Sequence, residues 1–435
     1  MLSVTVGAIS FIVITLLTGM RVPIALSLGG VAFIGMWIIV GPTVTLAIAK
    51  STPFEVAASW ELSAVPLFIL MGNIAFRTGM TESLFRAARL WLGWLPGGLA
   101  VATNFASAGF SAASGSSLAT TIAMGRLAIP EMRKFGYDNA LTMGTVTAAG
   151  TLGSLIPPSI ILVIYGIFAE QSVSKLFIAA IVPGIITAII YAAMIIIRCW
   201  LNPALAPVPD KAADWGERFS SLIDIWPLPL LVAGVIGSIY TGIATATEAA
   251  ALGATLAFMI ALAQRRLTIQ NFASSLMETV VSSGALFFIA VGAILMNRFM
   301  GFSGLPTYLA NLLEVYAVDP WMLLLLTGVF FFILGTVMEG LGMVLLTLPI
   351  LIPVFDSQGF DLIWFGILVV KFVEIAALSP PLGLNMFAAA SIVPDIPITT
   401  VFRGVMWFIF CEFIVVLLLV LFPEMTHWLL PASVQ

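Results

Sequence analysis

Apolar segments of about twenty residues, the length of helix that spans the hydrocarbon core of a bilayer, recur from one end of the chain to the other. Of the 435 residues, 61% are hydrophobic and 9% are charged, whereas roughly 25% of the residues of a soluble domain are charged. The stretches between the apolar segments are too short for a soluble domain. The sequence therefore predicts an all-α polytopic membrane protein.

The sequence contains no motif of a familiar enzyme. It lacks the P-loop, H-E-x-x-H and G-x-S-x-G patterns of nucleotide binding, metalloproteolysis and serine hydrolysis. A single histidine, His427, excludes a metal cluster built on histidines. Cys199 and Cys411 lie far apart in separate apolar runs, where we expect them to fill space. We expect no enzyme activity, no cofactor and no nucleic-acid partner, and no energy supply from ATP hydrolysis.

An internal repeat is predicted at an offset of 223 residues. Gly19, Gly30 and Pro130 match Gly242, Gly253 and Pro353, "FGYD" at 135–138 lies over "QGFD" at 358–361, and Pro157-Pro158 lies over Pro380-Pro381. Self-similarity at a fixed offset indicates repeated structural units. We place the first repeat at 1–201, a polar cytoplasmic linker at 202–224 and the second repeat at 225–435.

Each repeat is predicted to cross the membrane five times. Segment 2–19 has no basic region before it, so we interpret it as a membrane helix rather than a signal peptide. In 80–94 the apolar and charged residues fall on opposite faces, which indicates a helix at the membrane surface. The predicted spans are 2–19, 22–40, 62–77, 138–170 and 176–199, then 225–242, 243–263, 280–298, 361–393 and 397–421, with a second amphipathic piece at 304–316.

Segments 97–131 and 321–355 are predicted to be re-entrant hairpins. The first contains "SAASGSS" at 111–117, and serine and glycine favour turns and caps over continuous helix. Non-helical backbone is tolerated at membrane depth only where protein or a wet cavity surrounds it. We expect each tip to reach the membrane midplane, with the second tip at "GTVMEG" (335–340).

The helix that follows each hairpin is predicted to be discontinuous. Proline removes an amide donor and interrupts the hydrogen-bond ladder of a helix. Pro157-Pro158 interrupts segment 138–170, and "SPPLG" at 379–383 interrupts segment 361–393.

The odd number of crossings predicts that the two repeats are inverted relative to each other. Lys and Arg are enriched in cytoplasmic loops. With the N-terminus in the periplasm, only Lys50, Lys175 and Arg298 of the basic residues in loops fall outside the cytoplasm. In this orientation the first hairpin enters from the cytoplasm and the second from the opposite side.

Inverted repeats with re-entrant tips facing broken helices are the layout of a secondary transporter, in which tips and breaks converge near the midplane. Helix N-termini offer amides to an anion there, and helix C-termini and unwound carbonyls offer oxygens to a cation. The alternative for the "SGSS" string is close packing of small residues between helices. The first predicted oxygen cage contains Ser114, Ser116, Ser117, Gly150, Thr151 and Ser154, and the second contains Gly335, Thr336, Glu339, Ser379, Gly383 and Asn385.

Charges inside a membrane are costly and indicate function. Glu339, in the second tip, is predicted to bind or gate a cation. Lys371 and Glu374 are three residues apart and share a helix face, so a structural ion pair and a transport role both stay open. Glu248 is predicted to support the interior, with a transport role also open.

The chain resembles the large membrane subunit of tripartite ATP-independent periplasmic (TRAP) transporters over essentially its whole length. The strings that carry the resemblance are "AASGSSLATTIAMGRLAIPEM", "AAGTLGSLIPPSIILVIYG", "LGTVMEGLGMVLLTLPILIPV" and "SPPLGLNMF". It implies sodium-coupled uptake of an organic acid, such as a C4-dicarboxylate or a sialic acid, across a bacterial inner membrane by an elevator-type movement. It also implies two partners, a periplasmic substrate-binding protein and a small membrane subunit. The fold resembles, more distantly, that of the divalent-anion/sodium symporters.

The resemblance also implies roles for individual residues. The sodium ligands would be Ser114, Gly115, Ser116 and the region of Thr151 in the first repeat, and Gly335, Thr336 and Ser379 in the second. Where the family often has Asp in the second tip, this chain has Glu339, which keeps the charge on a longer side chain. We further expect Ser117, Pro158 and Asn385 to contact the substrate.

Two other functions compete with this interpretation. A sodium/carboxylate symporter that needs no binding protein would have the same layout. An intramembrane enzyme would need a cluster of catalytic residues, which the sequence does not offer, and a channel would not need two inverted hairpins.

Overall fold

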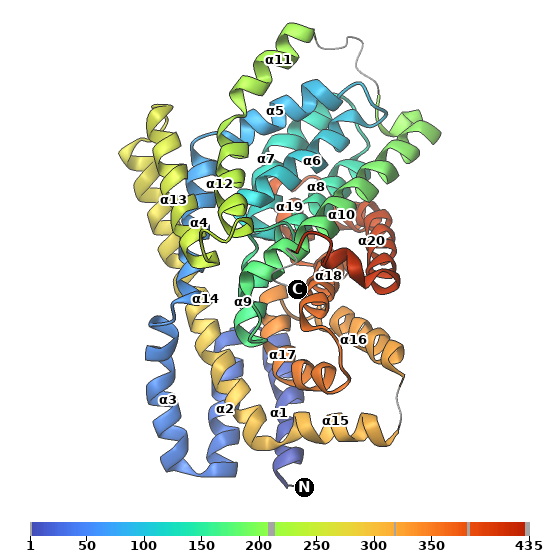
Figure 1. Ribbon diagram of the computed structural model, residues 1–435. Helices are drawn as coiled ribbons and strands as arrows, with labels where there is room; N and C mark the ends of the chain where they lie inside the picture. The colour runs from blue at the N-terminus through green and yellow to red at the C-terminus, as the bar shows by residue number, and fades with distance from the viewer. Residues whose placement is uncertain (1, 208–213, 317–318, 381–382, 431–435) are drawn as a thin grey trace.

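The computed structural model describes residues 2–207, 214–316, 319–380 and 383–430. Every regular element in these residues is a helix, which confirms the all-α prediction (Figure 1). The first half contains α1 (Leu2–Gly19), α2 (Ile24–Val40), α3 (Pro42–Ala57), η1 (Glu61–Ser63), α4 (Ala64–Arg77), α5 (Met80–Leu92), α6 (Gly98–Ser114), α7 (Ser117–Lys134), α8 (Asn139–Leu155), α9 (Ile160–Phe168), α10 (Val173–Leu201) and η2 (Pro203–Leu205). The second half contains α11 (Trp215–Asp224), α12 (Pro227–Tyr240), α13 (Ala246–Ala263), α14 (Ile269–Ser303), α15 (Leu305–Val315), α16 (Pro320–Leu334), α17 (Gly340–Ser357), α18 (Leu362–Leu378), α19 (Leu384–Ile392), α20 (Ile398–Leu421) and η3 (Pro423–Thr426).

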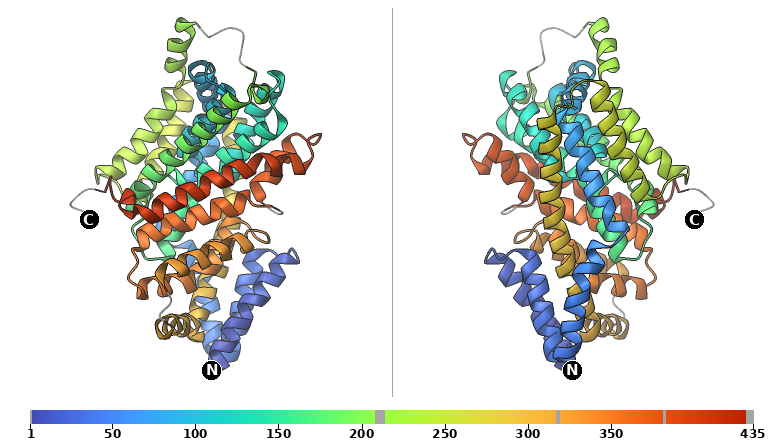
Figure 2. Two further views of the ribbon diagram at one scale, coloured as in Figure 1. Left: turned by 90° about the vertical axis from the view of Figure 1, so that its right-hand side faces the viewer. Right: turned by 90° about the vertical axis from the view of Figure 1, so that its left-hand side faces the viewer.

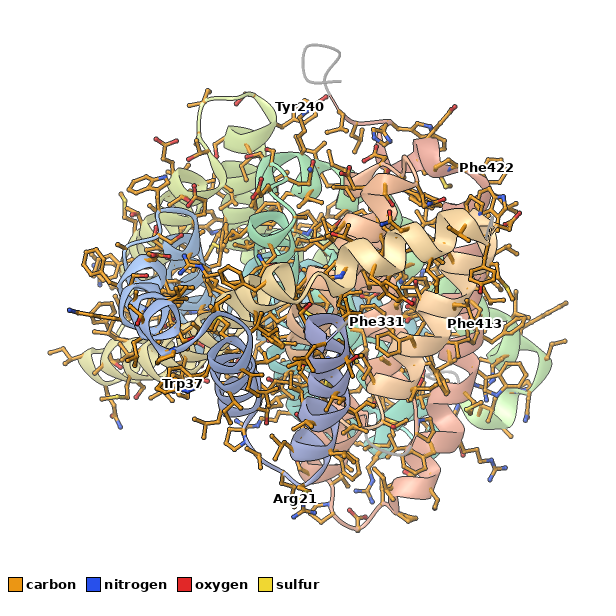
Figure 3. The ribbon with its side chains drawn as sticks, turned by 90° about the horizontal axis from the view of Figure 1, so that it is seen from below. Arg21, Trp37, Tyr240, Phe331, Phe413 and Phe422 are labelled. Carbon is orange, nitrogen blue, oxygen red and sulfur yellow. The ribbon has the colours of Figure 1, made fainter. Side chains whose placement is uncertain are left out.

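The described helices have the length and composition of a multi-pass membrane protein. Seven of them are long and apolar enough to cross a bilayer, or up to nine if each of two bent pairs counts as one span. Large apolar side chains cover the outside of the helices: Trp37, Tyr240, Phe413 and Phe422 are 44–54% exposed, and Tyr240 and Phe422 lie near the edge of the molecule in Figure 3. Such a surface suits contact with lipid rather than water.

The helix bounds in the two halves follow the offset seen in the sequence. Adding 223 to the bounds of α7 and α8 gives the bounds of α17 and α18. Local chemistry explains the match at the turns. Gly136 and Gly359 follow α7 and α17 with φ of +73° and +74°, a conformation that glycine adopts without a steric cost. Asp138 and Asp361 then cap the next helices, accepting hydrogen bonds from Leu141 N at 2.9 Å and Ile363 N at 2.6 Å.

The two amphipathic helices lie at opposite ends of the molecule. Figures 1 and 2 show α5 at the top beside α11, and α15 at the bottom near the N-terminus. Arg89 of α5 pairs with Glu131 of α7, so α5 is fastened to the first hairpin. If the second repeat is inverted, its amphipathic helix must lie at the opposite end of the molecule from that of the first, as α5 and α15 do. The inversion itself stays a prediction.

Three helices differ from the predicted spans. No span is predicted over α3, because Lys50, Pro53 and Glu55 interrupt its apolar pattern; α3 meets the next helical stretch at a bend of 50°. Helix α11 occupies the end of the predicted linker, where Asp214 caps it; residues 208–213 of that linker lie outside the described residues. Helix α14 begins at Ile269, well before the predicted start at 280.

The centre of the molecule is built around α8 and α18, in which nearly every residue is buried. Helix α8 packs against α20 with backbone in contact. A Cβ on Gly404 would lie 2.0 Å from Ala140 O, and one on Gly144 would lie 2.5 Å from Gly404 C. Small residues allow such close approach between membrane helices. This packing places the ends of α8 and α18, where the helices break, in the interior.

Candidate functional site

The first hairpin turns between Ser114 and Ser117. Helix α6 ends at Ser114, Gly115 leaves it with φ of +62°, and Ser116 caps α7 by accepting a hydrogen bond from Ala119 N at 3.4 Å. The Ser114 hydroxyl is 2.8 Å from Thr120 Oγ1, within the hairpin. Only Gly115 and Ser116 therefore separate α6 from α7.

The first helix break lies directly against this tip. Helix α8 ends at Leu155 and α9 begins at Ile160, whose amide donates to Gly115 O at 3.1 Å. A Cβ on Gly115 would lie 2.6 Å from Pro158 O, and one on Gly153 would lie 2.6 Å from Ser116 O. Any larger residue at either glycine would separate the tip from the break.

Ser159 stabilises the start of α9 inside the break. Its hydroxyl donates to Ser154 O and accepts from Leu162 N at 3.4 Å, so it joins the end of α8 to the start of α9. An N-cap satisfies amides that the first turn of a helix leaves without partners.

The second tip runs from Gly335 to Glu339. The Thr336 hydroxyl donates to Ile333 O at 2.7 Å. A Cβ on Gly335 would lie 2.4 Å from the Cβ of Ala376, so the tip rests on α18. Glu339 occupies the N-cap position of α17, but its carboxylate makes no capping hydrogen bond there. Glu339 lines a cavity.

The second break follows α18. Ser379 is buried and its hydroxyl donates to Ile375 O at 2.6 Å. Gly383 N donates to Ser379 O at 3.1 Å just before α19 begins. Pro381 and Leu382, part of the predicted "SPPLG" break, lie outside the described residues.

Both tips and both breaks line one cavity of about 150 Å³. The first tip contributes Gly115, Ser116, Ser117 and Leu118, the first break Ser154, Ile160 and Ile161, the second tip Glu339, Gly340 and Leu341, and the second broken helix Val373, Ala377, Leu384 and Asn385. Asn385 Nδ2 is buried and has no hydrogen-bond partner among the described residues. It is therefore a free donor beside the cavity.

The structure divides the residues predicted from the sequence into two groups. Those that line the cavity are Gly115, Ser116, Ser117, Ser154, Glu339 and Asn385. Those that lie outside its lining are Ser114, Gly150, Thr151, Pro158, Gly335, Thr336, Ser379 and Gly383. Some of the second group serve packing: a Cβ on Gly150 would lie 1.9 Å from Thr121 Oγ1, which shows how closely α8 approaches α7.

The other predicted charges do not line the cavity. Lys371 Nζ is 2.6 Å from Glu374 Oε2, so the ion pair suggested by their spacing is present. Glu412 of α20 joins the same pair, and the sequence analysis did not identify it, although an acid in the middle of an apolar span is the signal that marks such residues. Glu248 does not support the interior. It is exposed and forms a capping box with Thr245 at the start of α13.

This chain is similar to known transporter proteins both in its sequence and in its fold. The profile of the family described as "Tripartite ATP-independent periplasmic transporter, DctM component" matches residues 11–425. The chain is 35% identical over 340 residues to the C4-dicarboxylate TRAP transporter large permease protein DctM of Pseudomonas aeruginosa, covering 78% of this chain and 79% of that one. It is 33% identical over 369 residues to the sialic acid TRAP transporter large permease protein SiaM of Vibrio cholerae, covering 85% and 86%. The YdaH transporter of Alcanivorax borkumensis has a similar fold, with a TM-score of 0.66 over 90% of this chain and 91% of that one, at 15% identity.

Proposed function

Because the chain belongs to the DctM family of large permease components of tripartite ATP-independent periplasmic transporters, we propose that it takes up an organic acid by sodium-coupled secondary transport. The chain is a multi-pass membrane transporter rather than an enzyme. The proposal that an organic acid and sodium bind to this chain depends on one observation, the cavity lined by both hairpin tips and both broken helices.

The cavity suits an anion because four helices begin at it. Ser117, Ile160, Gly340 and Leu384 are the first residues of α7, α9, α17 and α19, and all four line the cavity. The N-terminus of a helix carries about half a positive charge and amides without partners, and it attracts carboxylates. Four such ends around one space provide positive potential for an organic acid without a basic side chain in the lining.

The same cavity offers oxygens to a cation at its edges. Gly115, Ser154 and Ala377 lie at the C-terminal ends of α6, α8 and α18, where backbone carbonyls lack helical partners. Gly115 O and Ser154 O each accept one hydrogen bond, from Ile160 N and the Ser159 hydroxyl, and keep a second lone pair. Hard monovalent and divalent cations prefer oxygen ligands. We assign sodium to the members of the predicted cages that line the cavity, which are Ser116, Ser117 and Ser154 beside the first tip and break and Glu339 at the second tip.

The size of the cavity favours a small acid. Drug-sized ligands occupy pockets of roughly 300–1,000 Å³, whereas this cavity measures about 150 Å³. A C4-dicarboxylate fits that space better than a nine-carbon sugar acid, which would need the tips to part. We therefore place a dicarboxylate first among the candidate substrates.

The family supports the remaining features of the proposal. We propose that a periplasmic binding protein delivers the acid, that a small membrane subunit assembles with this chain in a bacterial inner membrane, and that the hairpins and broken helices move together across the bilayer as an elevator. The distribution of Lys and Arg supports an N-terminus in the periplasm.

Uptake by reconstituted protein tests the proposal. The full chain is placed in liposomes with its small subunit, and uptake of succinate and of a sialic acid is measured under an inward sodium or potassium gradient, with and without the binding protein. We expect succinate uptake that requires both sodium and the binding protein. Equal uptake in sodium and potassium would refute sodium coupling, and uptake without the binding protein would identify a receptor-independent symporter.

A further inference from the structure

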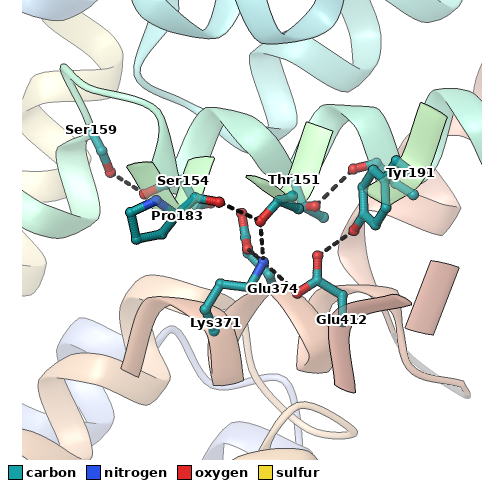
Figure 4. A network of polar contacts seen from close by, with 10 residues as sticks. Thr151, Ser154, Ser159, Pro183, Tyr191, Lys371, Glu374 and Glu412 are labelled. Carbon is teal, nitrogen blue, oxygen red and sulfur yellow. Dashed lines mark hydrogen bonds and ion pairs between the residues drawn. The ribbon is translucent and has the colours of Figure 1, made fainter. Parts of the chain in front are cut away.

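Three ionisable side chains meet in the interior where α10, α18 and α20 pack together (Figure 4). Lys371 Nζ lies 2.6 Å from Glu374 Oε2 and 2.5 Å from Glu412 Oε2, and all three side chains are 0% exposed. None of them lines the cavity between the tips. We call Lys371, Glu374 and Glu412 the buried triad.

Neighbouring groups satisfy two members of the triad. Lys371 Nζ also donates to Thr187 Oγ1 at 3.2 Å, so its ammonium group meets three oxygens. Glu412 Oε1 accepts a hydrogen bond from the Tyr191 hydroxyl. The contact of Lys371 with Glu412 Oε2 is ionic, with an angle outside hydrogen-bond geometry. Lys371 and Glu412 thus have the surroundings of a charged pair.

Glu374 and Glu412 each have one oxygen without a hydrogen bond, but the two oxygens have different surroundings. Glu412 Oε2 lies 2.5 Å from the ammonium group of Lys371, whereas no cation or donor is found beside the buried Glu374 Oε1 among the described residues. A buried carboxylate without compensating donors is strongly destabilised. If all three groups were charged, the triad would carry one uncompensated negative charge.

One bound cation would neutralise the triad, and the geometry favours a proton. A metal ion needs several oxygen ligands around it, but Lys371 already occupies the space between the two carboxylates. No group of three or more His, Cys, Asp or Glu side chains arranged to hold a metal ion occurs in the part of the chain that the structure describes. A proton needs only the single bare oxygen of Glu374.

We propose that the buried triad is a proton-binding site, with one proton held on Oε1 of Glu374. The other titratable groups beside it are Lys371 on the same helix, Glu412 and Cys411 on α20, and Tyr191 on α10. Helix α8, which also packs there, contributes no titratable side chain. Proton binding is then linked to the packing of α10, α18 and α20, independently of how sodium and substrate bind.

Infrared spectroscopy of the full chain in lipid vesicles measures how many carboxyl groups are protonated, because a neutral carboxyl and a carboxylate absorb at different frequencies. Wild-type protein at neutral pH should carry one more neutral carboxyl than Glu374→Gln. Glu412→Gln should also lose that signal, because Lys371 then pairs with Glu374 alone. Glu278→Gln, at an exposed ion pair with Arg77, is the matched control and should leave the triad signal unchanged.

Thermal unfolding identifies which carboxyl holds the proton. Glu374→Gln imitates the neutral acid, so it should keep the wild-type midpoint at neutral pH, whereas Glu412→Gln removes the satisfied carboxylate and should lower it. The wild-type midpoint should fall as pH rises, because the folded state then loses a proton that the unfolded state has already released. Glu374→Gln should remove that pH dependence.

Three results would overturn the proposal. The first is an infrared spectrum of Glu374→Gln that retains the full wild-type signal of neutral carboxyls. The second is a midpoint that falls in Glu374→Gln but not in Glu412→Gln, which would assign the proton to Glu412. The third is a wild-type signal that disappears when sodium replaces choline in the buffer, which would make sodium the bound cation.

Discussion

Replacing Gly115 by alanine should separate the first hairpin tip from the first helix break. Gly115 has φ of +62°, and an added Cβ would lie 2.6 Å from Pro158 O. The left-handed conformation costs about 1–2 kcal/mol for a residue with a Cβ. Because the atom that the Cβ meets is a backbone oxygen, which cannot rotate away, the tip must also withdraw and lose the hydrogen bond from Ile160 N to Gly115 O. An unmade buried hydrogen bond costs about 1–3 kcal/mol, so Gly115→Ala should cost about 2–5 kcal/mol in all.

Gly304→Ala is the matched control for this substitution. Gly304 also ends a helix with positive φ, +67°, but an added Cβ would have no atom within 4 Å. It should therefore cost only the conformational part, about 1–2 kcal/mol. The difference between the two variants isolates the contact between the tip and the break.

Thermal unfolding of the detergent-solubilised chain in sodium or in choline measures both effects. A ligand at a concentration one hundred times its Kd stabilises the folded state by about 2.7 kcal/mol. Gly304→Ala should keep the rise in midpoint that sodium produces, whereas Gly115→Ala should lower the midpoint further and abolish that rise. Equal midpoints and equal sodium responses in the two variants would refute the argument that this contact shapes the cation site.

Three further substitutions test the site and its support. Ser116→Ala removes the cap of α7 and should cost about 0.5–2 kcal/mol in stability, with a smaller sodium-dependent rise in the unfolding midpoint. Glu339→Gln removes the only carboxylate among the described residues that line the cavity and should weaken sodium stabilisation, whereas Glu339→Asp should retain part of it. An unchanged response in Glu339→Gln would exclude Glu339 as a ligand. Gly144→Ala forces a Cβ against the backbone of α20 and should destabilise by about 1–3 kcal/mol. Gly284→Ala, with no atom within 4 Å of its added Cβ, should be neutral or stabilising by up to about 1 kcal/mol, and similar losses in both variants would contradict the packing argument.

Local chemistry explains which parts of the fold the sequence predicts well. Gly136 and Asp138 end one helix and start the next through interactions within a few residues, so the same letters at 359 and 361 indicate the same turn. The hairpins and helix breaks are visible for the same reason, because glycine, serine and proline act on neighbouring backbone. Helix α3 is missed because Lys50 and Glu55 make its sequence resemble a loop. In the folded chain Arg298 of α14 bonds Thr52 at 3.1 Å and Glu55 at 2.5 Å, a tertiary support that no local pattern reveals.

Whether a residue lines the cavity depends on the partner helix, and the sequence pattern does not contain that information. Gly150 and Ser154 are one turn apart on α8, yet only Ser154 lines the cavity, because Thr121 of α7 covers Gly150. Corresponding positions in the two halves give a second example. At the offset of 223, Thr151 corresponds to Glu374, so equivalent positions hold a hydroxyl in one half and a carboxyl in the other. The second half can carry this acid because Lys371, one turn earlier, lies 2.6 Å from it, and because the proposed proton offsets the second negative charge that Glu412 adds. Helices with matching bounds in the two halves therefore need not bind the same ions. We expect a change of pH to alter the protonation of α18, which carries Glu374, but not that of α8, which carries Thr151 at the corresponding position.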